Sequence, residues 1–159
     1  MTEDARFEDG GETPLRLKAL DADDLMVLSA LVQDSIFPAK EIVWKQKERR
    51  FAILLNRFRW EDVTAAELRR RPVERVQSVL VIEDVVSVQS QGVNKSDGEM
   101  VLSLLSIAFE AGEDGTGHVL LTFAGDGQIR LEVEALEVIV RDVTRPYVAP
   151  SRAVPTHKD

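Results

Sequence analysis

The sequence predicts an α+β domain that consists mainly of antiparallel β-sheet. β-Branched and alternating apolar runs recur between residues 41 and 140, a Gly-Asp-Gly hairpin signal separates two of them, and residues 21–35 have the apolar period of a helix. We therefore expect two three-stranded meanders, packed as a sandwich or closed as a barrel, with one amphipathic helix near the N-terminus. The length of 159 residues fits a single domain, which we place at residues 14–144. We expect a disordered acidic tail at residues 1–13 and a Pro-containing tail at residues 145–159.

The domain begins with a strand and then the helix. Residues 15–20 alternate between apolar and polar side chains, which is typical of a strand with one buried face. Asp21 can accept hydrogen bonds from the free backbone N–H groups at the start of the helix, and Asp23 and Asp24 favour the positive end of its dipole. Pro38 ends the segment. The apolar stripe of the helix consists of Leu25, Leu28, Leu31, Val32 and Ile36.

A first series of strands follows the helix. Strands at residues 41–46 and 50–58 flank a hairpin turn at residues 47–49. A capping box and a later proline predict a short helix over residues 65–71. Residues 76–88 are rich in β-branched side chains and apolar on both faces, which predicts one long central strand.

A second series of strands has a similar order. We expect strands at residues 100–110, 118–124 and 128–140, with a hairpin turn at residues 125–127. Residues 135–143 either continue the last strand after a bulge or form a helix, and their β-branched side chains favour the strand.

The two series resemble each other. Residues 80–85 and 131–136 align at their apolar positions and at one glutamate. This similarity indicates an internal repeat of two meanders, with chance as the alternative because any two apolar strands match at several positions.

Charge is unevenly distributed along the chain. Residues 38–75 hold eleven Lys and Arg and six Asp and Glu, a net charge of +5, whereas residues 76–142 hold three and twelve, a net charge of −9. The opposite charges of the two segments could complement each other across an interface or attract partners of opposite charge. The alternative is that the segments form two solvated faces of one domain. The net charge of −8 argues against general nucleic-acid binding, which requires a basic surface.

The composition also predicts a cytoplasmic protein. The N-terminus is acidic and has no apolar core, unlike a secretory signal. The longest apolar run without a charge, residues 100–109, spans about half of a bilayer, so we expect no membrane association. The chain has no cysteine, which excludes disulfides and thiolate chemistry.

Catalytic patterns are weak in this sequence. His157 lies near the Pro-rich end, and His118 begins a strand on the face opposite its apolar residues, so neither has an evident catalytic partner. Gly112, Gly115 and Gly117 have the wrong spacing for a dinucleotide-binding loop. We therefore expect no catalytic residues, no metal and no cofactor, and lean away from an enzyme.

The strongest candidate for binding is the segment of residues 56–61, where arginines alternate with aromatic residues. These residue types are common at protein interfaces and can also hold an anionic ligand. Three arginines follow at residues 69–71, at the end of the predicted short helix. Cations at this end of a helix are also favoured simply because they offset the helix dipole. The alternative is an aromatic pair in the core with exposed arginines. The candidate binding residues are Arg57, Arg59, Trp60, Arg69, Arg70 and Arg71.

Several strings in the chain resemble one bacterial protein family. They are Lys47–Phe51, Leu55–Phe58 with Trp60 and Glu61, Ser96 and Asp97 with Val101–Leu105, and Phe123–Gly125 with Ile129–Leu131. Together they resemble the family of domain of unknown function 2948 over most of residues 15–145. The resemblance implies a small cytoplasmic protein and carries over no functional residue.

Two functions remain open at this stage, and a third, RNA association through the basic segment at residues 38–75, is disfavoured because the whole chain is acidic. The first is a non-enzymatic protein-interaction module, with a protein partner or self-association as a homodimer, using residues 56–71. The second is a small anionic-ligand-binding protein, or an enzyme, with a pocket at a barrel mouth.

Overall fold

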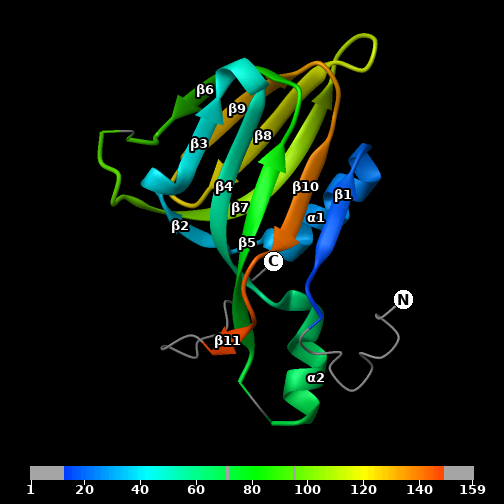
Figure 1. The fold of residues 1–159 in the computed structure, drawn as a ribbon, viewed down its shortest axis with the longest axis vertical. Helices are drawn as coiled ribbons and strands as arrows, with labels where there is room; N and C mark the ends of the chain where they lie inside the picture. The colour runs from blue at the N-terminus through cyan, green and yellow to red at the C-terminus, as the bar shows by residue number, and fades with distance from the viewer. Residues whose placement is uncertain (1–12, 71, 95, 149–159) are drawn as a thin grey trace.

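Antiparallel β-strands make up most of the protein in a computed structural model that describes residues 13–70, 72–94 and 96–148 (Figure 1). In chain order the elements are β1 (Arg16–Ala19), α1 (Ala22–Val32), β2 (Ile36–Pro38), η2 (Ala39–Glu41), β3 (Ile42–Lys45), η3 (Gln46–Glu48), β4 (Arg50–Phe58), η4 (Trp60–Asp62), α2 (Val63–Leu68), β5 (Glu74–Ile82), β6 (Val85–Gln91), β7 (Val101–Ala111), β8 (Gly117–Phe123), β9 (Gln128–Val133), β10 (Val138–Asp142) and β11 (Tyr147–Val148). The prediction of a mainly antiparallel protein with few helices is confirmed.

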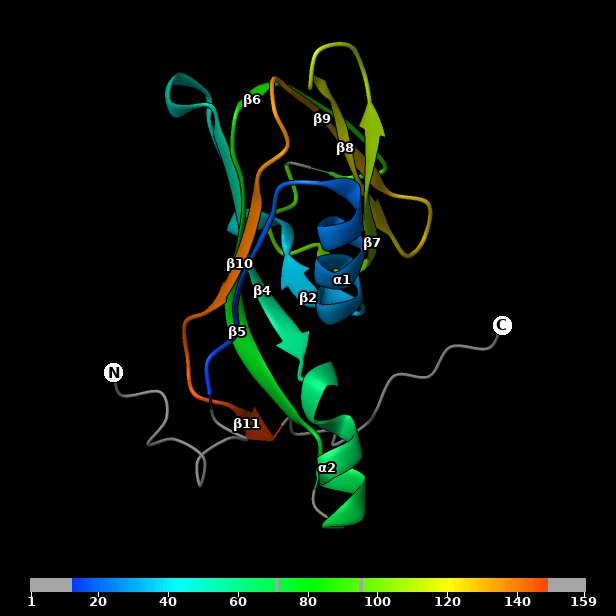
Figure 2. The same ribbon diagram turned by 90° about the vertical axis from the view of Figure 1, so that its right-hand side faces the viewer.

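The strands form two layers that face each other (Figure 2). The first layer contains β3, β4, β5, β10 and β1, and the second contains β7, β8, β9 and β6. Strand β2 connects them, because Ile36 pairs with Asn56 of β4 on one side and with Ser103 of β7 on the other. The sheet is not closed into a barrel, so the barrel alternative is wrong.

Helix α1 begins where the sequence predicts and ends earlier. Asp21 caps it, with its Oδ1 accepting a hydrogen bond from the backbone N–H of Asp24 at 2.8 Å. The helix ends at Val32, and Asp34 then adopts a left-handed conformation with φ of 65°. Ile36, which the periodicity assigned to the helix, belongs to β2 instead. The apolar stripe packs on β7 and β1 through Leu25, Leu28 and Val32.

The long strand predicted over residues 76–88 is two strands. β5 ends at Ile82 and β6 begins at Val85, and between them Asp84 has φ of 58°. The chain crosses here from the first layer to the second, where β6 pairs with β9. The prediction of one strand was wrong because both strands have the same apolar composition, so the turn left no break in the pattern.

A second crossing returns the chain to the first layer. Residues 135–143, whose structure the sequence left open, contain β10, which pairs with β5. The two crossings contact each other, since the backbone N–H of Glu83 bonds to the oxygen of Glu137 at 3.0 Å and that of Glu134 to the oxygen of Asp84 at 3.0 Å. The aligned segments 80–85 and 131–136 thus both lead into a crossing, while the origin by duplication stays a prediction.

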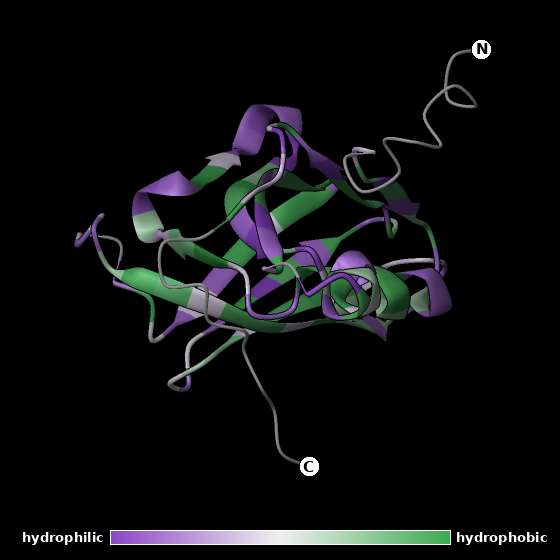
Figure 3. Cartoon of the chain, turned by 90° about the horizontal axis from the view of Figure 1, so that it is seen from below, coloured by the Kyte–Doolittle hydropathy of each residue, from purple (hydrophilic) through white to green (hydrophobic). Residues whose placement is uncertain are grey.

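The hydrophobic core fills the space between the layers. Figure 3 shows that hydrophobic residues lie mainly on the strands and hydrophilic residues mainly on the connections. Phe37 of β2 meets Phe123 of β8 edge-on, with ring centroids 5.8 Å apart, so the connecting strand is anchored in this core. Of the predicted tails, residues 1–12 and 149–159 lie outside the described residues, and Tyr147–Val148 pair with β5 as β11.

Candidate functional site

The arginine–aromatic segment lies at the lower end of the first layer. Arg57 is on the same side of β4 as the buried Phe51, Ile53 and Leu55, so its side chain faces inward and is fully buried. The expectation of exposed arginines is wrong. The signal was available in the sequence, because Arg57 continues the alternation of these three apolar residues at a spacing of two.

The buried guanidinium of Arg57 is held by two carboxylates. Its Nε and Nη2 donate to the two oxygens of Asp142 at 3.0 Å each, and its Nη1 and Nη2 donate to Glu61 at 2.9 and 2.7 Å. Ser78 Oγ and the backbone oxygen of Phe58 accept further bonds at 3.1 and 3.2 Å. Asp142 also accepts from the backbone N–H of Leu15 at 2.7 Å. The cluster therefore ties β4, β5, β10 and η4 to Leu15, which directly precedes β1.

Electrostatics keep this arginine charged. Burial acts to lower the pKa of Arg57, but the hydrogen bonds and negative charges of Glu61 and Asp142 outweigh it and raise the pKa above its ordinary value. A charge this deeply buried requires such partners. The guanidinium is thus committed to internal carboxylates.

Arg59 and Trp60 are also engaged within the protein. Arg59 is 2% exposed, and its Nη1 donates to Glu74 at 2.7 Å and to Asp62 at 3.2 Å. The indole N–H of Trp60 donates to the backbone oxygen of Gln33 at 2.8 Å, which links η4 to the end of α1. Arg59 therefore fastens the connection between β4 and α2 to β5, and Trp60 fastens it to the end of α1.

The structure does not bring the six candidate residues together. Arg69 and Arg70 are exposed at the end of α2, which extends away from the sheet (Figure 1), and Arg71 lies outside the described residues. Binding by these residues stays a prediction. The burial of Arg57 and Arg59 and their bonds to internal carboxylates favour a structural role for these two residues.

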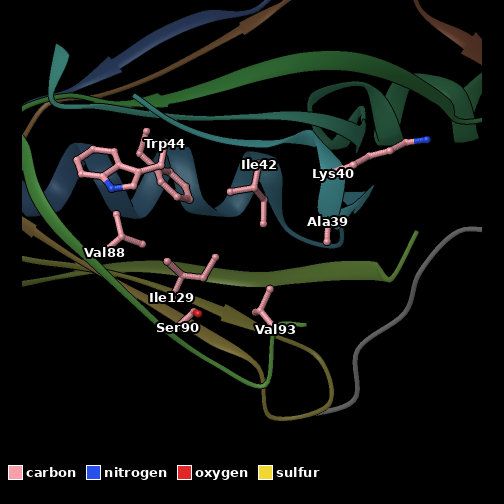
Figure 4. A pocket seen from close by; sticks show the side chains of 9 residues that line it. Ala39, Lys40, Ile42, Trp44, Val88, Ser90, Val93 and Ile129 are labelled. Atoms are coloured by element: carbon pink, nitrogen blue, oxygen red, sulfur yellow. The ribbon is translucent and has the colours of Figure 1, made fainter. Parts of the chain in front are cut away.

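A pocket of about 250 Å³ lies between the edge strands β3 and β6 (Figure 4). At one end the backbone N–H of Val85 bonds to the oxygen of Arg49 at 2.9 Å, and at the other Lys40 bonds to Gly98 at 2.9 Å. We call this opening the window pocket. It is lined by Ala39, Lys40, Ile42, Trp44, Phe51, Val88, Ser90, Val93 and Ile129.

The window pocket is suited to an apolar molecule. Its lining is mainly aliphatic and aromatic, and Ser90 supplies a hydroxyl. Lys40 points away from the other lining side chains (Figure 4), and its Nζ donates to Glu99 at 2.9 Å. That hydrogen bond and the charge of Glu99 raise the pKa of Lys40. Sequence reasoning missed this pocket because β3 and β6 come together only in three dimensions.

The outer face of the first layer, turned away from the second layer, is unusually apolar. The pairing aligns Val43, Ala52, Val81 and Ile139 in one row across β3, β4, β5 and β10. Leu54 and Val79 form part of the next row. We call these six residues the outer patch. Val43 is 43% exposed and the others are half-buried.

The second layer provides the contrast. Along β9, the outward positions Gln128, Arg130 and Glu132 are polar and exposed, as expected for a sheet with one face in water. Along β5, the corresponding positions Val79 and Val81 are apolar. No element of the described chain lies over the outer patch (Figure 2).

A shallow hollow of about 220 Å³ adjoins the outer patch where β2 meets β4. Its apolar walls include Ile36, Leu54 and Val101, of which Ile36 is 37% and Val101 66% exposed. Glu41 and Asn56 add polar groups. The apolar surface thus extends from the outer patch into a depression.

A catalytic histidine, a metal site and a membrane-spanning helix have little support within the described residues. His118 is half-buried on β8, opposite Glu110 and Glu132 on the neighbouring strands. In residues 13–70, 72–94 and 96–148, no group of three or more His, Asp or Glu side chains is arranged to hold a metal ion. Within the same ranges, no helix has the length and apolar character needed to cross a membrane.

Comparisons with known proteins place the chain in a family. No curated protein and no solved structure matches it. A family model described as protein of unknown function (DUF2948) matches residues 15–157. Because this match covers most of the chain, the protein belongs to that family.

Proposed function

We propose that this is a bacterial, cytoplasmic, non-enzymatic interaction module that binds a protein partner through the outer patch. The observation that carries the proposal is the apolar face of β5, where Val79 and Val81 point away from the core. Apolar side chains on the open face of an antiparallel sheet are costly in water and mark interaction surfaces. The proposed surface replaces the one expected at residues 56–71.

The position of the outer patch favours a protein as its ligand. Its six residues lie on four adjacent hydrogen-bonded strands, which form a rigid and broad surface. Protein interfaces have this form, an apolar centre with a polar rim. The rim here includes Lys18, Glu137, Arg50 and Glu83, joined in two ion pairs.

Site-specific photo-crosslinking in the native lysate tests this proposal. A benzophenone side chain at Val81 should give a discrete protein adduct, and Leu54→Lys should abolish that adduct. The same group at Val27, 56% exposed on α1, is the matched control. The absence of any adduct at Val81, or an equal yield from Val27, would contradict the proposal.

The window pocket supports a second candidate function, the binding of a small amphipathic anion. Pockets at the mouths of β-structures that are mainly apolar, with few polar groups, are typical ligand sites. Here an apolar body would contact Trp44 and Ile42, and an anionic group at the pocket mouth would draw the Lys40 side chain away from Glu99 and toward the pocket.

Anilinonaphthalene sulfonate, which has an aromatic body and an anionic group, is a suitable probe. The proposal predicts saturable binding to the folded protein with one site per chain. Val93→Trp should fill the pocket and remove binding, whereas Val143→Trp, at a residue 41% exposed elsewhere, should leave it unchanged. Equal binding by both variants would rule out this site.

A further inference from the structure

We propose that the partner of the outer patch is a second copy of this chain, related by a two-fold axis along the row of Val43, Ala52, Val81 and Ile139. This inference rests on the proposed function, because it names the occupant of the same surface. A two-fold contact requires that the surface complement itself after rotation. Rotation about this row stacks each strand on the same strand of the other copy in the opposite direction. A residue before the row therefore faces the residue of the other copy that lies equally far after it.

The charges on β10 and beside Val43 satisfy this requirement. Lys18 of β1 continues the row beside Ile139 and so faces Lys18 of the other copy, and within each chain its charge is neutralised by Glu137 at 3.4 Å. Glu137, in the crossing just before β10, and Arg141 of β10 lie two residues before and after Ile139. Before and after Val43, the corresponding residues are Glu41 and Lys45. The rotation therefore places Glu137 opposite Arg141 and Glu41 opposite Lys45 of the other copy. Four pairs of opposite charge result, two on each side of the apolar row.

Three of these four charged residues are available for such contacts. Glu41, Lys45 and Arg141 have no ion-pair partner within the described chain. Arg141 also lies directly opposite Arg16 of β1, and like charges on neighbouring strands are unfavourable. An acidic residue from a partner would relieve this repulsion.

On the central strands, the ion pair of Arg50 and Glu83 in one copy lies over apolar side chains of the other copy. Around Ala52 of β4 the exchanged positions are Arg50 and Leu54, and around Val81 of β5 they are Val79 and Glu83, which directly follows the strand. Arg50 Nε donates to both oxygens of Glu83 at 3.1 and 3.2 Å, so the charges balance each other within one copy. The aliphatic part of the arginine can then lie on Leu54 of the other copy.

The β3–β4 hairpin fits the hollow in the same arrangement. Glu48 at its tip and Asn56 in the hollow lie four residues before and after Ala52 on the β4 segment. The tip leans outward on the side of the outer face (Figure 2). The rotation therefore brings each tip over the hollow of the other copy, where the exposed Lys47 approaches Glu41.

The area of the outer face sets the expected affinity of the dimer. The four strands of the outer patch together with β1, spaced about 4.8 Å apart, and five residues of about 3.3 Å each give a face of roughly 24 by 17 Å. Two such faces bury roughly 800 Å² before the hairpins are added, which is at the low end for specific interfaces. We therefore expect a reversible dimer with a dissociation constant in the micromolar range.

Charge exchange tests the two-fold geometry. In sedimentation velocity from about 1 to about 200 μM, the native chain should shift from monomer to dimer. Glu41→Lys alone and Lys45→Glu alone should each weaken the dimer about tenfold, because each creates two like-charged contacts. The double variant Glu41→Lys with Lys45→Glu should restore native affinity. Circular dichroism checks that all variants are folded.

A central substitution and its control complete the experiment. Val81→Asp should abolish the dimer, and Val27→Asp on α1 should have no effect. A monomer at every concentration, a dimer that tolerates Val81→Asp, or a double variant as weak as the single ones would each overturn the inference. If the chain is monomeric while Val81 crosslinks to another protein, self-association fails and the proposed interaction role stands.

Discussion

Replacing Arg57 by methionine should destabilise the protein severely. The substitution keeps an unbranched side chain of similar length and removes the guanidinium. Asp142, with its side chain 3% exposed, and Glu61, at 29%, then lose their cationic partner. Ser78 would keep its 2.7 Å bond to Asp142, which cannot replace a charge.

The expected magnitude follows from this burial. Removing one partner from a buried ion pair costs about 3–5 kcal/mol, because the remaining charge is left without compensation. Domains of this size have a free energy of unfolding of roughly 5–15 kcal/mol, so the loss is a large part of the total. With a urea dependence of about 2 kcal/mol per molar, the unfolding midpoint should fall by about 2 M.

Urea unfolding followed by circular dichroism measures this effect. Arg70→Met, at the exposed end of α2, is the matched control and should change the free energy of unfolding by less than about 0.5 kcal/mol. A loss below about 1 kcal/mol for Arg57→Met, with an unchanged urea dependence, would refute a buried ion cluster. The guanidinium would then be solvated and free to bind a ligand.

Three further predictions concern local features. Asp21→Ala removes the cap of α1 and should cost about 1 kcal/mol of unfolding free energy in the same assay; an unchanged midpoint would show that the cap contributes nothing. Gly117→Ala should cost about 1–3 kcal/mol, because its Cβ would collide with the backbone oxygen of Glu110 and lie 2.6 Å from the ring of Phe109; native stability would contradict this close packing. Glu99→Gln should lower the pKa of Lys40 toward its ordinary value of 10.5. Because the pKa of Lys40 is raised in the folded state, its pairing with Glu99 should stabilise the fold fully at pH values below 10.5. This stabilisation should be lost as the pH rises through the raised pKa of the folded state. NMR titration of the lysine side chain measures this pKa, and equal values in both proteins would refute the pairing.

Much of the secondary structure could be predicted because it depends on local patterns. The cap at Asp21 and the apolar period fixed the start of α1, and the hairpin signal at residues 125–127 separated β8 from β9. The patterns failed where the chain changes partners without changing composition. The crossing at Asp84 and the short strand β2 are both of this kind.

The candidate site was harder to predict than the fold. The segment of residues 56–61 was identified as chemically unusual, but its arginines are buried rather than exposed. Their carboxylate partners come from different distances along the chain, since Asp142 is 85 residues from Arg57 and Glu74 is 15 from Arg59. A linear sequence does not show such pairs.

The sequence by itself determined the antiparallel class, the position of the main helix and the two apolar faces of β5. Only the tertiary structure decided that no element of residues 13–70, 72–94 and 96–148 covers one of those faces. The reason is physical. Side-chain alternation and capping act over a few residues, whereas the cover of a sheet face depends on which distant strands pair and where the chain crosses between layers. The inner face of β5 meets the core, whereas Val79 and Val81 on its outer face are half-buried.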